Sequence, residues 1–83
     1  KVFVDGQMIS LRPKEFDLLY FLARNEDIVF SRNDLLEKVW GYSYAGDDRT
    51  VDTQVKMIRH ALGPYRKFIV TYRGVGYKFE AEK

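Results

Sequence analysis

The most constraining feature of this sequence is an apolar pattern with the period of an α-helix in residues 49–62. On a helical wheel of about 100° per residue, four apolar side chains cluster within about 40°; they are Val51, Val55, Ile58 and Leu62. A Gly-Pro pair at 63–64 follows and ends the helix. The pattern therefore predicts a helix with one buried face, which other elements must cover.

The opposite face of this predicted helix carries no acidic residue. It holds Arg49, Thr53, Lys56, Met57 and His60, with Gln54 and Arg59 on its flanks and Asp52 at its edge. Side chains of these kinds reach base edges or phosphates, and an α-helix fits the major groove of DNA. The face favours nucleic-acid binding, with an ordinary solvated helix face as the open alternative.

Two elements are predicted near the start of the chain. Residues 2–4 and 8–11 read as short strands, joined by an Asp-Gly turn at 5–6 that is typical of a type I′ hairpin. Pro13 suits the first turn of a helix that runs to about residue 25. The face of this helix is predicted from the spacing i, i+3, i+4, i+7 of Phe16, Leu19, Tyr20 and Ala23, widened by Leu18 and Leu22.

A second, shorter helix of about nine residues is predicted to follow Ser31. The Ser31 hydroxyl is placed to cap it, and Asp34 stands at the third helical position, as in a capping box. Gly41 is placed to end it in the left-handed αL conformation. Residues 28–30 before the cap are interpreted as a short apolar connection.

The last predicted element is a hairpin of strands 68–72 and 77–80, joined by the turn 73–76 with its two glycines. Arg73 at its tip suits the minor groove, because narrow A·T-rich grooves attract arginine; an ordinary β-turn is the alternative. The predicted fold class is α+β, a single domain of residues 1–83 with three helices packed between small antiparallel sheets.

Composition excludes several other classes. The chain has no cysteine and a single histidine, which excludes disulfides and a standard metal site. No nucleophile–base pair or phosphate-binding glycine loop is visible, so no enzyme activity or cofactor is predicted. No apolar run approaches the roughly 18 residues that span a bilayer.

Charge is distributed unevenly along the chain. Residues 1–48 carry six Lys and Arg against nine Asp and Glu, a net charge of −3. Residues 49–83 carry eight against three, a net charge of +5. Such an asymmetry points to a polyanionic partner, although chance alone can produce it in a chain with so few charges.

Five motifs together resemble the effector domains of OmpR/PhoB-type response regulators. They are LRPKEF at 11–16, SR at 31–32, VWGY at 39–42, DRTVD at 48–52 and TYRGVGY at 71–77. Each motif alone is weak, but five in the order of the family cover nearly the whole chain. The resemblance implies a bacterial winged helix-turn-helix transcription factor of a two-component system.

The resemblance also implies roles for individual residues. It assigns base contacts to Thr53, Gln54, Met57 and, in the minor groove, Arg73. It assigns phosphate contacts to Arg32, Trp40, Arg49, Thr50, Lys56, Arg59 and Tyr77. Loop 41–48 matches a segment through which some members touch RNA polymerase, and it includes Tyr42, Ser43, Tyr44, Ala45, Gly46 and Asp47.

The implied partners follow from the same resemblance. Family members normally carry an N-terminal receiver domain, absent from this chain, that is phosphorylated on Asp. They bind tandem DNA repeats as dimers. We therefore expect a cytoplasmic protein that is monomeric as this isolated domain, pairs on double-stranded DNA, contacts RNA polymerase through loop 41–48, and has no membrane partner or cofactor.

Some residues depart from the family or allow two interpretations. Arg12 replaces the usual Thr, Met57 stands where Arg or Lys is frequent, and segment 63–67 is shorter than usual. Asp52 is interpreted as neutralising Arg49 or a wing arginine, and Asp47 with Asp48 as a cap and ion pair rather than a cation site. Trp40 is expected mostly buried with one exposed edge. A protein-interaction module without DNA binding is the alternative function.

Overall fold

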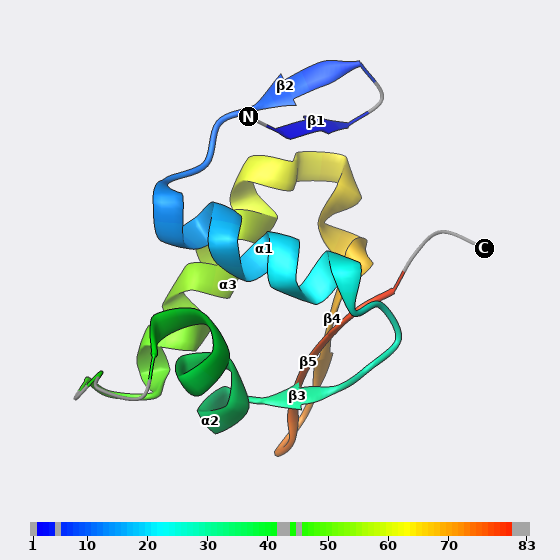
Figure 1. The fold of residues 1–83 in the computed structure, drawn as a ribbon. Helices are drawn as coiled ribbons and strands as arrows, with labels where there is room; N and C mark the ends of the chain where they lie inside the picture. The colour runs from blue at the N-terminus through cyan, green and yellow to red at the C-terminus, as the bar shows by residue number, and fades with distance from the viewer. Residues whose placement is uncertain (1, 5, 42–43, 45, 81–83) are drawn as a thin grey trace.

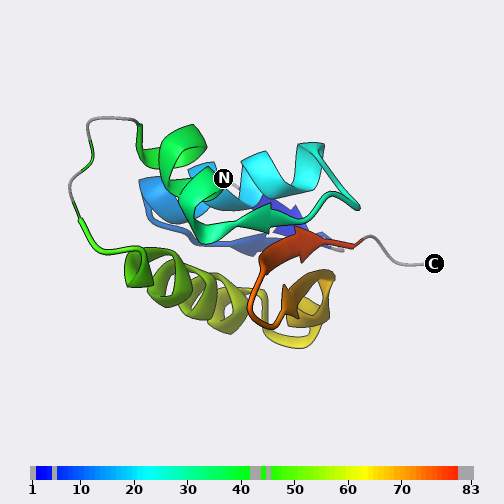
Figure 2. The same ribbon diagram turned by 90° about the horizontal axis from the view of Figure 1, so that it is seen from below.

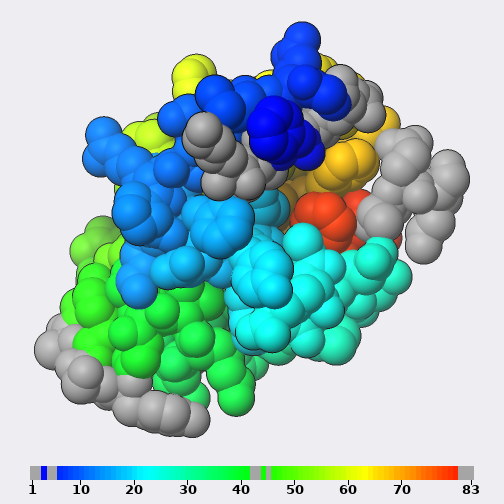
Figure 3. All heavy atoms as spheres, turned by 45° about the horizontal axis from the view of Figure 1, so that its top comes forward, coloured from blue at the N-terminus to red at the C-terminus, as the bar shows by residue number. Residues whose placement is uncertain are grey.

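The computed structural model describes residues 2–4, 6–41, 44 and 46–80. A hairpin of β1 (Val2–Val4) and β2 (Gln7–Ile9) comes first, lies at one end of the molecule and is followed by α1 (Pro13–Arg24) (Figure 1). The space-filling view shows the same hairpin at the surface, along one edge of the molecule (Figure 3). Gly6 in its turn has a φ of +80°, as the expected Asp-Gly turn requires at that position; Asp5 lies outside the described residues.

The remaining described elements are four helical segments, of which α2 and η1 are continuous, and the strands of a second sheet. They are β3 (Phe30–Ser31), α2 (Arg32–Leu35), η1 (Leu36–Trp40), α3 (Arg49–Leu62), η2 (Gly63–Phe68), β4 (Ile69–Tyr72) and β5 (Gly76–Phe79). The second sheet has the antiparallel order β3-β5-β4. The predicted order of hairpin, three helices and hairpin is confirmed, with η2 as an added 3-10 helix where a short connection was expected.

The core forms where α1, α2, α3 and the second sheet meet. The four apolar residues predicted for α3 are all buried, with at most 3% exposure, and so are Leu18, Leu22, Leu35 and Ile69. α1 buries a face one position earlier than predicted, namely Glu15, Leu18, Leu19 and Leu22. Tyr20, predicted on the buried face, is 54% exposed and stacks on Phe16 at 5.8 Å between ring centroids.

The start of α2 is held by the predicted capping box. The amide of Asp34 donates to Ser31 Oγ over 3.0 Å, and the amide of Ser31 donates to Asp34 Oδ2 over 3.3 Å. A similar box starts α1, because the backbone amide of Arg12 donates to Glu15 Oε1 over 2.9 Å. Replacement of the family Thr by Arg12 therefore leaves half of that cap in place.

The second helix changes its winding halfway, which its sequence did not predict. After four α-helical residues it continues as a π-helix, and the amide of Gly41 bonds to the carbonyl of Leu36 over 2.8 Å. Gly41 has φ +103° and ψ 159°, so the expected αL ending is wrong. An αL cap is not needed here, because the amide of Gly41 already bonds to the carbonyl of Leu36. The carbonyl of Val39 near the helix end accepts from Lys14 Nζ over 3.2 Å.

Strand β3 was predicted as a mere connection and pairs with β5 instead. Phe30 lies opposite Tyr77, and Ser31 lies opposite Gly76. The close pairing of the two strands requires glycine at position 76, since a Cβ there would collide with the backbone carbonyl of Phe30. The cap residue of α2 is thus bonded into the sheet that carries the C-terminal hairpin. No helix in the described part of the chain is long and apolar enough to cross a bilayer.

Candidate nucleic-acid interface

The outer face of α3 has the exposure that its sequence predicts. Arg49, Thr53, Lys56, Met57 and His60 are all exposed, and Met57 reaches 47%. Gln54 and Arg59 on the flanks are half-buried. No acidic side chain interrupts this face, so α3 presents cationic, hydroxyl and apolar groups along one side.

The hairpin β4–β5, called the wing below, lies beside α3, and its turn lies on the same side of the molecule as α3 (Figure 2). Within the turn, the amide of Val75 bonds to the carbonyl of Tyr72 over 2.8 Å, and Gly74 adopts a φ of +78°. Arg73 and Val75 are exposed at the tip. A rod-shaped ligand lying along α3 would therefore also meet Arg73.

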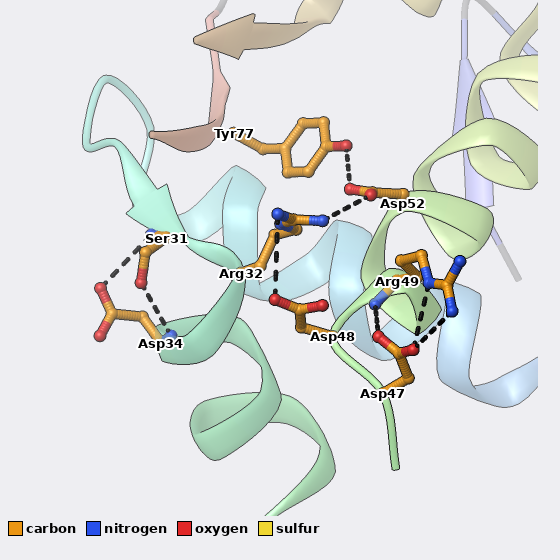
Figure 4. Close-up of polar contacts among 8 residues, drawn as sticks. All are labelled: Ser31, Arg32, Asp34, Asp47, Asp48, Arg49, Asp52 and Tyr77. Carbon is orange, nitrogen blue, oxygen red and sulfur yellow. Dashed lines mark hydrogen bonds and ion pairs between the residues drawn. The ribbon is translucent and has the colours of Figure 1, made fainter. Parts of the chain in front are cut away.

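One carboxylate joins three elements behind this surface. Asp52 on α3 accepts from Arg32 Nη1 on α2 over 2.9 Å and from the Tyr77 hydroxyl on β5 over 2.5 Å (Figure 4). Arg32 also lies 3.9 Å from Asp48. Burial, followed by the hydrogen bond to Asp52, raises the pKa of Tyr77 to about 12.

The ion-pair partner expected for Asp52 from the sequence is therefore wrong. Asp52 was expected to neutralise Arg49 or a wing arginine, and its ion pair in the described structure is with Arg32. Arg49 is turned to the preceding loop, where Nε and Nη2 donate to Asp47 Oδ2 over 3.1 and 3.0 Å. The predicted ion pair of Asp47 is confirmed, and hydrogen bonds from the Arg49 backbone and side chain lower its pKa to about 2.

Arg59, predicted as a phosphate contact, is held by the wing. Its Nη2 donates to the carbonyl of Ile69 and to Thr71 Oγ1, each over 2.7 Å. Its guanidinium also lies 5.8 Å from the centroid of the Tyr77 ring. These contacts join the C-terminal half of α3 to β4 and β5. Tyr77 is itself only 8% exposed, so both side chains serve the packing of the wing.

The segment between α2 and α3 starts from a partly buried aromatic. Trp40 packs against the core with its ring 6.2 Å from that of Tyr44, and Lys14 lies 6.0 Å over the indole. The Tyr44 hydroxyl lies 3.0 Å from Thr50 Oγ1 at the start of α3. Gly46 and Asp47 are exposed. The predicted loop residues Tyr42, Ser43 and Ala45 lie outside the described residues.

The chain is similar to known regulatory proteins over most of its length. Residues 6–79 match the family model "Transcriptional regulatory protein, C terminal". The chain is 52% identical over 84 residues to the transcriptional regulatory protein ResD of Bacillus subtilis, covering 96% of this chain and 35% of ResD. It spans only 35–37% of the length of the first such relatives.

Two solved structures share the fold. DrrB of Thermotoga maritima, described as an OmpR/PhoB homologue, is 43% identical with a TM-score of 0.84, covering 95% of this chain and 37% of DrrB. The DNA-binding domain of Klebsiella pneumoniae RstA, in complex with the RstA box, is 32% identical with a TM-score of 0.77, covering 90% of this chain and 77% of that one.

Fold and surface together define a winged helix-turn-helix domain, with α2 and α3 as the helical pair and β4–β5 as the wing. The wing and the exposed face of α3 lie on one side of it. The chain belongs to the family of C-terminal domains of transcriptional regulatory proteins and is of the OmpR/PhoB type. That family consists of DNA-binding regulators rather than enzymes.

Proposed function

We propose that this domain binds double-stranded DNA sequence-specifically as the output domain of a transcription regulator. The observation that carries the proposal is the acid-free exposed face of α3 beside the β4–β5 hairpin, whose turn holds the exposed Arg73. An α-helix of this character fits the major groove, and the wing then reaches the adjacent minor groove. A protein-interaction module would give no reason for such a surface.

Individual roles are proposed from exposure and hydrogen bonding. The exposed or half-exposed residues Thr53, Gln54 and Met57 face bases, and Met57 suits the methyl group of thymine. Phosphates are contacted by Arg32, Trp40, Arg49, Thr50 and Lys56. Arg59 and Tyr77 act differently, because Arg59 donates to β4 and Tyr77 is buried with its hydroxyl on Asp52. They hold α3 and the wing at a fixed spacing. Arg32 and Arg49 also pair with carboxylates, but their side chains remain 42% and 80% exposed.

The test is the salt dependence of binding to duplex DNA. If the domain neutralises about four to six phosphates, the logarithm of the association constant falls against the logarithm of salt concentration with a slope of about −4 to −5. A binding-site selection on random duplexes then gives the preferred sequence. A slope near zero on duplex DNA would overturn the proposal.

The wider context is proposed from the relatives. Residues 1–83 form one domain, which in the full-length protein is joined to a receiver domain. The chain acts in the bacterial cytoplasm on tandem repeats, with loop 41–48 available to RNA polymerase. We expect this isolated domain to be a monomer that pairs on DNA; sedimentation showing a stable dimer without DNA would contradict this.

A further inference from the structure

A groove of about 800 Å³ runs between the C-terminal half of α3 and the 3-10 helix η2 with the start of β4. Its lining includes Lys56, Met57, Arg59, His60, Arg66 and Lys67, and Asp52 is its one acidic residue. Figure 2 shows η2 continuing directly from α3 below the second sheet. The groove therefore opens beside the helix face that is proposed to enter the major groove.

The charges in this groove are not balanced by the protein. Asp52 already accepts from Arg32 and Tyr77. Arg59 is bonded to the carbonyl of Ile69 and to Thr71. Within the described residues, neither Lys56 nor Arg66 forms an ion pair, and both are exposed. Lys56 and Arg66 thus line one concave surface whose single carboxylate, Asp52, is bonded elsewhere, an arrangement that attracts a phosphate.

The place of the groove matches the course of a DNA strand. Lys56 and His60 are one helical turn apart on the face that holds Thr53 and Met57. When that face lies in the major groove, a phosphate backbone bordering it passes alongside α3. Arg66 on η2 forms the far wall and would meet the same strand from the other side.

We propose that this groove is a phosphate-binding site, in which Arg66 on η2 and Lys56 on α3 contact the DNA backbone from opposite walls. The inference rests on the proposed DNA binding and adds the segment between α3 and the wing to the interface. Because the contact is to the backbone, it contributes to affinity for all sequences and not to the choice among them.

The experiment compares Arg66→Ala, Arg66→Lys and Arg24→Ala on a mixed-sequence duplex over a range of salt concentrations. Arg24 is an exposed arginine near the end of α1, outside the groove, so its loss controls for net charge. We expect Arg66→Ala to lower the magnitude of the salt slope by about one and to weaken binding similarly on all duplexes. Arg66→Lys keeps the charge and the slope, and Arg24→Ala matches wild type. Thermal unfolding of each variant shows whether the fold is kept.

The outcomes separate this inference from the proposed function. If wild type binds with a steep slope and Arg66→Ala behaves like Arg24→Ala, the groove does not hold DNA, while the DNA-binding function stands. If wild type itself shows no slope, both fall. A parallel titration with inorganic phosphate alone, followed by amide shifts around the groove, covers the other source of a phosphate. Saturation by inorganic phosphate, with no effect of Arg66→Ala on the duplex, would assign the groove to a small anion and overturn the proposal.

Discussion

The hydroxyl of Tyr77 donates a hydrogen bond to Asp52 Oδ1 over 2.5 Å and joins β5 to α3, although 25 positions separate the two residues in the chain. Asp52 also pairs with Arg32, so a single carboxylate connects α2, α3 and the wing. Helix α3 is therefore held by side chains from both α2 and β5. This contact sets the first prediction.

Tyr77→Phe removes the hydroxyl and keeps the ring. The free energy of unfolding should fall by about 1.5–3 kcal/mol, since the lost hydrogen bond was made to a charged group. The pKa of Tyr77 is raised from 10.0 to about 12, so the folded state keeps a proton that the unfolded state releases. The stability from this group is therefore present below pH 10 and is lost as pH rises to about 12.

Denaturant titrations of both proteins across this pH range measure the effect. The difference between wild type and Tyr77→Phe should shrink as pH rises toward about 12, because wild type then loses the stabilisation from Tyr77. A constant difference would show that Tyr77 does not titrate in this window.

Lys56→Ala and Arg59→Ala should differ although both remove a cation from α3. Lys56 is exposed, so its loss should lower the magnitude of the salt slope by about one and leave the unfolding midpoint unchanged. Loss of the Arg59 hydrogen bonds to Ile69 and Thr71 should cost about 1–3 kcal/mol of stability. Equal unfolding midpoints for the two variants would show that the Arg59 hydrogen bonds do not stabilise the packing of α3 against β4.

The two glycines at the wing should respond differently to alanine. Gly74 has a φ of +78° with open space around it, so Gly74→Ala should cost about 1–2 kcal/mol of stability from backbone strain. At Gly76 the added methyl group meets the backbone of Phe30, which cannot yield without breaking the pairing of β3 with β5. Gly76→Ala should cost more than about 2 kcal/mol. Thermal unfolding gives both values, and the reverse order would be incompatible with this packing.

Ser31→Ala should cost about 1 kcal/mol, the usual loss at a helix N-cap. The hydroxyl accepts from the amide of Asp34, and alanine leaves that amide without its partner. Asn33→Ala is a matched control, because Asn33 is exposed in the same helix and holds no cap. Denaturant midpoints compare the two, and an equal response would mean that the cap adds nothing.

Arg73→Ala should weaken DNA binding by about 1–3 kcal/mol without affecting the fold, because Arg73 is exposed in a turn. The loss should be larger where the flanking base pairs are A·T, since narrow A·T grooves attract arginine most strongly. Arg73→Lys should recover only part of the loss, because lysine is more strongly hydrated. Binding isotherms on duplexes with A·T or G·C flanks separate the cases. Equal losses would reduce Arg73 to a phosphate contact, and no loss would place the wing off the DNA.

Features governed by neighbours in sequence could be predicted here. The α3 boundaries, its buried face and the Ser31 cap all depend on residues within a turn or two, and the structure confirms them. The face of α1 was shifted by one position, because its ambiguous aromatics, Phe16 and Tyr20, stack on each other outside the core.

Features governed by distant partners could not be predicted. Strand β3 has two residues and exists only through β5, far along the chain. The exposed face of α3 followed from helical periodicity. The hydrogen bonds of Arg59 and Tyr77 could not be predicted in this way, because their partners lie on elements whose packing a single sequence does not reveal. The alternation in 76–79 was the one available signal, since it points Tyr77 inward.

The sheet order β3-β5-β4 has a consequence for how the domain is synthesised. Its central strand, β5, follows the other two in the chain. Until Gly76–Phe79 has left the ribosome, β3 and β4 have no neighbour, and α3 lacks the phenol that meets Asp52. A product truncated before Gly76 would therefore carry the whole of α3 without the support that orients it. Such a fragment would not compete with the complete protein for its sites on DNA.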